Sequence, residues 1–151
     1  DLAFSKLMQV NVQSTIWLTN LALPYFSDSK GGSIIFLSSI TAIMGTKKIG
    51  AYGVSKAAEA AIVRNLAYEL GSKNIRVNAI APGLIKTDFS RALWENPTIM
   101  KRQEDKTPLR RIGTPEDIAG VAHFLASDAS AFITGQFIIV DGGETISWDI
   151  D

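Results

Sequence analysis

Tyr52 and Lys56 are the two residues whose types and spacing point most directly to chemistry. They lie four positions apart at the start of an Ala-rich segment, so on a helix they share one face, one turn apart. An ammonium about 4 Å from a phenolate contributes ~4 kcal/mol at an effective dielectric of ~20. That equals roughly three pKa units, enough to bring a tyrosine from about 10 towards 7, where it could exchange protons with an alcohol or a carbonyl. On its own, however, a Tyr–Lys pair on a helix is more often a pair of exposed side chains with no function.

Ser39 and Asn11 are the next candidates. Ser39 ends an apolar run whose following loop leads into the Tyr52 helix, so both side chains should emerge at the same edge of a sheet. A hydroxyl there could hold a carbonyl oxygen as charge develops, or it could merely end a strand or cap a turn.

Asn11 falls on the apolar side of the first helical segment, where a buried amide needs partners. It either bonds nearby backbone, which the residue alone favours, or holds a water in a proton path.

A third candidate is the segment from Pro82 to Thr87, which follows a predicted strand. Gly83 permits close approach of the backbone to a ligand. The backbone amides and the Thr87 hydroxyl could then clasp a carboxamide or a phosphate. The alternative is an ordinary strand exit.

Alternating helical and apolar segments must position these residues. Apolar periodicity predicts helices over 2–26 and 51–72, short helices within 88–106, and a helix from Thr114 to Ser127. Thr114, Pro115 and Asp117 form a favourable helix start. Short apolar runs predict strands over 33–38, 75–81 and 136–140. Strands separated by helices predict an α/β protein with a parallel sheet, which binds ligands beyond the carboxyl ends of its strands.

The composition limits the class of protein. A chain of 151 residues fits one domain, 1–151. Fifteen basic and fifteen acidic residues give no argument for a nucleic-acid or anionic-membrane partner. The lack of cysteine excludes disulfides and zinc–thiolate sites and fits a reducing compartment, hence an expected cytoplasmic location. A single histidine excludes a multi-histidine metal site, and no apolar run approaches the roughly 20 residues of a membrane span.

Taken together, these residues resemble the short-chain dehydrogenase/reductase family. That family has an Asn on one helix, a Ser thirteen residues before a Tyr, and a Lys four residues after it. Here those positions are Asn11, Ser39, Tyr52 and Lys56. The Pro-Gly-x-x-x-Thr segment at 82–87 also matches. The stretches 111–118, 132–136 and 141–143 are especially similar to the 3-oxoacyl-carrier-protein reductase and carbonyl reductase branches.

The resemblance implies a Rossmann-like, doubly wound sheet and a role for each residue. Tyr52 would be the general acid in reduction and the general base in oxidation. Lys56 would bind the cofactor ribose and lower the tyrosine pKa, Ser39 would polarise the substrate oxygen, and Asn11 would hold a water linking Lys56 to solvent. The nicotinamide end of NAD or NADP would contact Pro82, Gly83, Ile85 and Thr87. The substrate would be a ketone or secondary alcohol, and the chain would form a homotetramer or dimer, built partly on the helix 51–72.

One departure from the family pattern is large. No Gly-x-x-x-Gly-x-Gly motif follows a strand, and no Asn-Asn-Ala-Gly motif precedes the first helix. We therefore expect an incomplete fold without the N-terminal dinucleotide-binding half, a truncation of some 90 residues at about 30 per βαβ unit. The isolated chain should then bind cofactor poorly and, with a sheet edge exposed, be unstable or self-associate.

Two other functions fit part of the pattern. A non-catalytic remnant or interaction module could retain the fold and its helix-packing surfaces. An epimerase or dehydratase could use Ser, Tyr and Lys around bound NAD. The Pro-Gly-x-x-x-Thr segment and the Asp-Gly-Gly ending favour the reductase branch over the epimerase.

Overall fold

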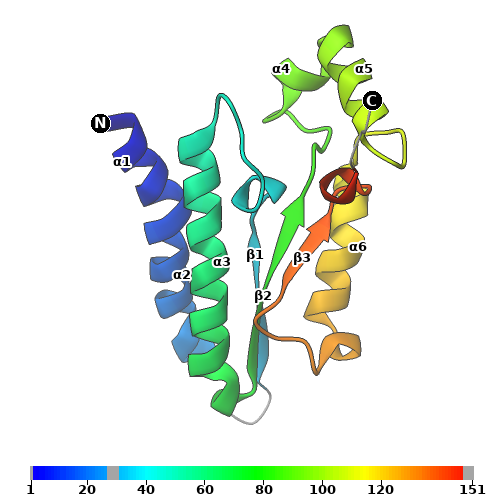
Figure 1. Ribbon diagram of the computed structural model, residues 1–151. Coiled ribbons are helices and arrows are strands. Elements are labelled where there is room, and N and C mark those ends of the chain that lie inside the picture. Colours follow the sequence, from blue (N-terminus) through cyan, green and yellow to red (C-terminus); the bar gives the residue numbers. More distant parts are fainter. Residues whose placement is uncertain (1, 27–30, 148–151) are drawn as a thin grey trace.

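The fold is a three-stranded parallel sheet with helices on both faces. The computed structural model describes residues 2–26 and 31–147 (Figure 1). The strands are β1 (Gly32–Leu37), β2 (Ile75–Pro82) and β3 (Phe137–Val140), in the order β1-β2-β3. Gly32 lies opposite Ile75, and Ala79 lies opposite Phe137. The predicted parallel sheet is confirmed, and each strand boundary lies within one residue of its prediction.

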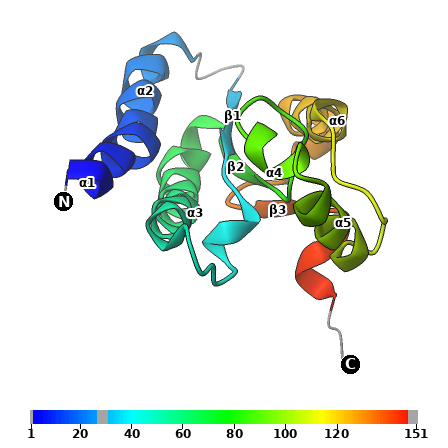
Figure 2. The same ribbon diagram turned by 90° about the horizontal axis from the view of Figure 1, so that it is seen from above.

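The central strand β2 is buried on both faces. One face packs on α3 (Gly50–Leu70), where Val63 and Leu70 of the helix meet Val77 and Ala79 of the strand. Because side chains alternate along a strand, Ile80 points to the other face, where α6 (Pro115–Ala126) lies. Seen from above, α3 and α6 lie on opposite sides of the sheet (Figure 2). A near-continuous apolar sequence is what such a doubly covered strand requires.

The first predicted helix is helical throughout but changes type in the middle. It consists of α1 (Leu2–Met8), a π-helical turn η1 (Gln9–Gln13), α2 (Ser14–Ala22) and a 3-10 turn η2 (Leu23–Tyr25). In the π turn the Ser14 N–H donates to the Gln9 carbonyl, five residues back. The Thr15 hydroxyl donates to the Val12 carbonyl at 2.7 Å. Such turns within α-helices are often found at functional sites.

The second half of the chain adds short helices above the carboxyl ends of the strands. They are α4 (Arg91–Trp94) and α5 (Pro97–Lys106), as the sequence predicts for 88–106 (Figure 1). The predicted start of α6 is confirmed: Asp117 accepts a hydrogen bond from the Thr114 backbone N–H at 2.8 Å. The Arg111 guanidinium binds the same carboxylate at 2.7 and 2.9 Å.

Arg76 ties the sheet to the end of α6. Its guanidinium donates to the Leu125 carbonyl and the Ser130 hydroxyl, both at 2.8 Å, and to the Ser127 carbonyl at 3.2 Å. An arginine on a buried strand thereby satisfies carbonyls that the helix end leaves unpaired. Among the described residues no helix is both long and apolar enough to cross a membrane.

Candidate active site

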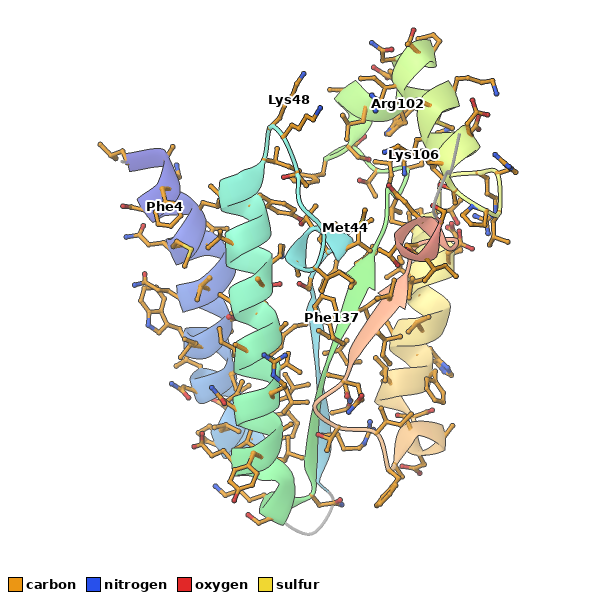
Figure 3. The ribbon with its side chains drawn as sticks, viewed as in Figure 1. Phe4, Met44, Lys48, Arg102, Lys106 and Phe137 are labelled. Carbon is orange, nitrogen blue, oxygen red and sulfur yellow. The ribbon has the colours of Figure 1, made fainter. Side chains whose placement is uncertain are left out.

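The candidate residues gather where β1 and β2 end. Ser38 and Ser39 follow β1, and the 3-10 turn η3 (Ile40–Ala42) comes next. The chain then loops up to the start of α3. Figure 3 shows Met44 above the end of β1 and Lys48 at the tip of this loop, across from Arg102 and Lys106 of α5. Loops at the carboxyl edge of a parallel sheet are the expected place for a ligand.

Tyr52 and Ser39 meet as the sequence predicts. Tyr52 lies in the first turn of α3, which packs against η3. The contact is close at Gly53, where a Cβ atom would lie 2.8 Å from the Thr41 carbonyl oxygen. Ser39 caps η3 by accepting the Thr41 N–H at 3.2 Å, and its hydroxyl acts to lower the pKa of the nearby Tyr52. Ser39 therefore combines the turn-capping role with a place beside the phenol.

Lys56 lies on the same helix face as Tyr52, with its ammonium 5.7 Å from the centre of the tyrosine ring. The Nζ atom donates to the Leu37 carbonyl at 3.0 Å and to Glu59 Oε1 at 2.8 Å. Both charged side chains are buried, with 11% of Lys56 and 3% of Glu59 exposed. The lysine is thus held between the end of β1 and a carboxylate that our sequence analysis missed.

This pairing changes the electrostatics of Tyr52. Burial raises the pKa of Tyr52, the hydrogen bond with Ser39 lowers it, and the negative charge of Glu59 raises it again. The net direction is upward. The prediction that Lys56 brings this pKa down towards 7 is therefore wrong for the protein as described. The main reason is burial of the phenol, which disfavours its charged form, and the Glu59 carboxylate acts in the same direction.

Asn11 lies in the π-helical turn and reaches across to α3. Its amide Nδ2 donates to the Ser55 hydroxyl at 2.9 Å, and that hydroxyl donates to the Tyr52 carbonyl at 2.7 Å. The Asn11 amide therefore bonds a side chain on another helix, whereas the residue alone favoured a bond to nearby backbone. The role of Asn11 as holder of a water that links Lys56 to solvent stays a prediction.

The segment from Pro82 to Thr87 continues directly from β2. The Gly83 N–H donates to the Val140 carbonyl at 3.0 Å. A Cβ atom at Gly83 would lie 3.0 Å from the Cα atom of Asp141, so the close approach that glycine allows is first of all to the end of β3. Ile85 pairs with Gly113 in an isolated parallel bridge. Within the described part of the chain, the N–H of Ile85 donates no hydrogen bond.

Ser90 organises the rest of this loop and was also missed. Its hydroxyl donates to the Ile85 carbonyl, and it accepts the Thr87 N–H at 3.2 Å. The Thr87 hydroxyl lies 3.2 Å from the same oxygen, and the Trp94 indole donates to the Thr87 carbonyl at 2.8 Å. Serine three residues after threonine is a common local turn pattern, which is the signal that could have pointed to Ser90.

The groups at this edge fit a nicotinamide cofactor. Lys56 uses two of its three N–H donors within the chain, and the Ile85 N–H is an unused backbone donor. The described residues contain no group of three or more His, Asp or Glu side chains arranged to hold a metal ion.

Comparisons with known proteins agree with this geometry. A family model described as enoyl-(acyl carrier protein) reductase matches residues 1–145. A curated relative, dehydrogenase/reductase SDR family member 4 of Bos taurus, is 43% identical over 140 residues, which are 93% of this chain and 50% of the relative. The chain belongs to the short-chain dehydrogenase/reductase family. It spans about half the length of the curated relatives it matches.

Solved structures of short-chain dehydrogenases share the fold. A gluconate 5-dehydrogenase from Burkholderia cenocepacia J2315, in complex with NADP and tartrate, has a TM-score of 0.92 at 28% identity. The match covers 97% of this chain and 57% of the dehydrogenase. A 4-hydroxyisoleucine dehydrogenase complexed with NADH has a TM-score of 0.92 at 32% identity, covering 98% of this chain and 61% of that enzyme. The Rossmann-like α/β class expected from the sequence is confirmed.

Proposed function

We propose that this chain carries the proton-transfer centre of an oxidoreductase that moves hydride between NAD(P)(H) and a ketone or secondary alcohol. The observation that carries the proposal is that Ser39 and Tyr52 meet where η3 packs on the start of α3, with the Lys56 ammonium 5.7 Å from the tyrosine ring. All three lie at the carboxyl edge of the sheet. A bound nicotinamide supplies or accepts the hydride.

In reduction, Tyr52 is the general acid. Its phenol donates a proton to the carbonyl oxygen as negative charge develops there, while the Ser39 hydroxyl donates a hydrogen bond to the same oxygen. In oxidation the proton moves the other way, and the Tyr52 phenolate is the general base that accepts it from the alcohol. Asn11 and Ser55 hold the first turn of α3 against the π-helical turn, which fixes the direction of the phenol.

The proposed cofactor is NAD or NADP. Solved relatives carry NADP or NADH, which supports a nicotinamide dinucleotide of either kind. We assign the ribose hydroxyls to Tyr52 and Lys56, and the nicotinamide end to Pro82, Gly83, Ile85 and Thr87. The free N–H of Ile85 would donate to the carboxamide. The Thr87 side chain, bound to Ser90, sets the shape of this loop.

The proposed substrate is a small carbonyl compound or alcohol, and the proposed assembly is a tetramer or dimer. Exposed apolar side chains on α1 and α2 support an assembly: Val10, Trp17 and Leu21 are 59%, 59% and 69% exposed. A patch of this kind on a soluble surface marks an interaction site.

The test measures NAD(P)H consumption with a panel of ketones. It uses the 151-residue chain alone and the same chain fused behind the amino-terminal half of the Bos taurus relative, hereafter the fusion enzyme. We expect slow turnover by the chain alone, turnover by the fusion enzyme, and a loss of at least 100-fold in Tyr52→Phe.

Three outcomes would contradict the proposal or one of its expectations. Unchanged turnover in the Tyr52→Phe fusion enzyme would remove Tyr52 from the chemistry. Turnover by the chain alone at the rate of a full-length relative would refute the expectation of poor cofactor binding. A fusion enzyme that binds NADH, by nicotinamide fluorescence, but reduces none of the ketones would favour the non-catalytic alternative.

A further inference from the structure

Two segments above the carboxyl ends of the strands carry an excess of positive charge. They are the loop 43–49, which leads into α3, and the stretch 86–106, which contains α4 and α5 (Figure 1). Together they hold seven basic and four acidic residues, in a chain whose formal net charge is zero. The proposed proton transfer uses none of these charges, so their purpose has to be sought separately.

Ion pairs within these segments engage most of the acidic residues but few of the basic ones. Arg91 binds both Asp88 and Glu95, and Lys101 binds Asp105. These three carboxylates are all but one of the acidic residues of the two segments. The basic residues that form no ion pair in the described part of the chain are Lys47, Lys48, Lys86, Arg102 and Lys106.

Three of these unpaired residues lie on two separate elements above the site. Figure 3 shows Lys48 at the tip of the loop 43–49, across from Arg102 and Lys106 on α5. Arg102 and Lys106 are four positions apart, so they share one face of the helix and repel each other. Like charges held together without a partner are unfavourable in the free protein, and a bound anion would relieve the repulsion. We call these three residues the basic rim.

Both parts of the basic rim are close to the candidate active site. Lys48 precedes Tyr52 by four positions, so their Cα atoms are at most about 14 Å apart. On α5, Gln103 follows Arg102 and lines a cavity together with Ile85 of the loop after β2. The basic rim therefore borders both the proton-transfer centre and the loop that we assign to the nicotinamide.

Few carboxylates oppose the field of the basic rim. Glu104, the unpaired acidic residue of α5, lies two positions from Arg102, and side chains at that spacing do not face each other. Glu144 interacts electrostatically with Lys106 and offsets part of its charge. Lys48 and Arg102 are therefore the cations of the rim that are best placed to act on a ligand.

We propose that the basic rim selects substrates that carry an anionic group, a carboxylate or a phosphate, a few bonds from the reacting carbonyl or alcohol. The inference rests on the proposed function for the identity of the reacting group. Positive charge around a cleft raises the local concentration of anions and speeds their association. Lys48 and Arg102 are thus specificity-determining residues, which act on substrate binding and leave the chemical step little changed.

The experiment compares charged and neutral ketones in the fusion enzyme. Levulinate carries a carboxylate, and methyl levulinate has the same ketone without the charge. Dihydroxyacetone phosphate and dihydroxyacetone form the corresponding pair for a phosphate. We expect a lower KM for the anionic member of at least one pair, with similar kcat, and the pair with the larger ratio identifies the group. Raising the salt from about 0.01 M to 1 M shortens the screening length from about 30 Å to about 3 Å and should remove the difference.

Variants of the basic rim test which residues are responsible. Lys48→Gln and Arg102→Gln should each raise the KM for the anionic ketone about fourfold, as for a unit charge ~10 Å away at an effective dielectric of ~40. The KM for the neutral ketone should not change. The control is Lys73→Gln, which removes an exposed lysine from the turn η4 (Gly71–Lys73) at the far end of α3 and should change neither value. The amino-terminal half is the same in every variant, so differences come from this chain.

A binding measurement separates this inference from the proposed function. With NAD⁺ or NADP⁺ bound, a ketone cannot be reduced, so calorimetric titration of each ketone into the loaded fusion enzyme reports binding alone. We expect tighter binding of the anionic ketone, lost in Lys48→Gln/Arg102→Gln. That result without turnover in NADH or NADPH would contradict the proposed function and leave the inference standing. Equal binding and equal KM for charged and neutral ketones, or a preference that the double variant retains, would overturn the inference, even in an active fusion enzyme.

Discussion

The ammonium of Lys56 lies 5.7 Å from the centre of the Tyr52 ring, yet it donates its hydrogen bonds to the Leu37 carbonyl and to Glu59. Proximity of a lysine to a tyrosine does not by itself lower the tyrosine pKa, because burial of the phenol and other nearby charges act on it as well. Here burial and the Glu59 carboxylate raise the pKa of Tyr52. Burial, the largest of these influences, therefore opposes formation of the Tyr52 phenolate.

The first prediction concerns Asn11. Asn11→Ala removes the 2.9 Å hydrogen bond to Ser55 and loosens the contact between η1 and α3. We expect a loss of about 1 kcal/mol in the free energy of unfolding, measured by urea titration. Turnover by the fusion enzyme should fall more than this loss of stability explains. The control is Asn20→Ala, an exposed amide on α2, and equal effects of the two variants would remove Asn11 from the site.

Ser90 gives a second prediction. Ser90→Ala removes the acceptor of the Thr87 N–H and the donor to the Ile85 carbonyl. The loop that should meet the nicotinamide end then loses its internal order, and we expect the KM for cofactor to rise roughly three- to tenfold, with a smaller change in kcat. Steady-state kinetics of the fusion enzyme measure both. Ser147→Ala, which removes an exposed hydroxyl bonded to the Glu144 carbonyl, should change neither, and an unchanged KM in Ser90→Ala would contradict the prediction.

The capping carboxylate of α6 predicts a pH dependence of stability. The Arg111 guanidinium and the Thr114 N–H hold the pKa of Asp117 well below its usual range. A carboxylate whose pKa is lower in the folded state stabilises the fold above the unfolded pKa, about 4, and loses this contribution as pH falls through the folded value. We expect the difference in Tm between the unsubstituted chain and Asp117→Asn to be present at pH 6 and to shrink as the pH falls below about 4.

The control for this pH series is Asp128→Asn. It removes an exposed carboxylate that forms no ion pair within the described part of the chain. Its Tm should differ little from that of the unsubstituted chain across the same series. A difference for Asp117→Asn that stays constant from pH 6 to pH 2 would show that the carboxylate charge is not the cause.

Leu125 provides a test of the packing of α6 on the sheet. The side chain is fully buried, at 0% exposure, near the end of α6. Leu125→Ala should lower the free energy of unfolding by about 2–5 kcal/mol, because both apolar contact and space are lost. Phe132→Ala, which truncates a side chain that is 103% exposed, should change it by less than about 0.5 kcal/mol. Urea titration of both variants gives the comparison.

Much of this architecture follows from local patterns in the sequence. The apolar runs gave the three strands because a strand covered on both faces needs apolar residues throughout. The capping residues gave the start of α6 because their role depends only on neighbours in the chain. Ser39, Tyr52 and Lys56 converge because they lie at or just beyond a strand end and the start of the helix that follows.

What the sequence did not predict depends on contacts between distant segments or on side-chain direction. In the sequence, Glu59 looks like any polar residue of an Ala-rich helix. Only the packing of that helix against the sheet shows that Glu59 is buried beside Lys56. Gly83 packs closely on Asp141, which lies 58 positions further along the chain, a contact that no local pattern indicates. The partner of Asn11 lies 44 positions away, beyond the reach of any local rule.

The π-helical turn at Gln9–Gln13 has a consequence for how the first helical segment can vary. A π turn accommodates one more residue than the α-helix around it, and each residue rotates a helix by about 100°. Because the wide turn absorbs the extra residue, deleting one residue here would restore an ordinary α-helical turn and leave α1 and α2 in nearly the same phase. The change would fall on the turn itself, where Asn11 lies, so the amide now bonded to Ser55 would shift relative to α3. The extra residue thus serves the contact with α3 and not the direction of the helix on either side of it.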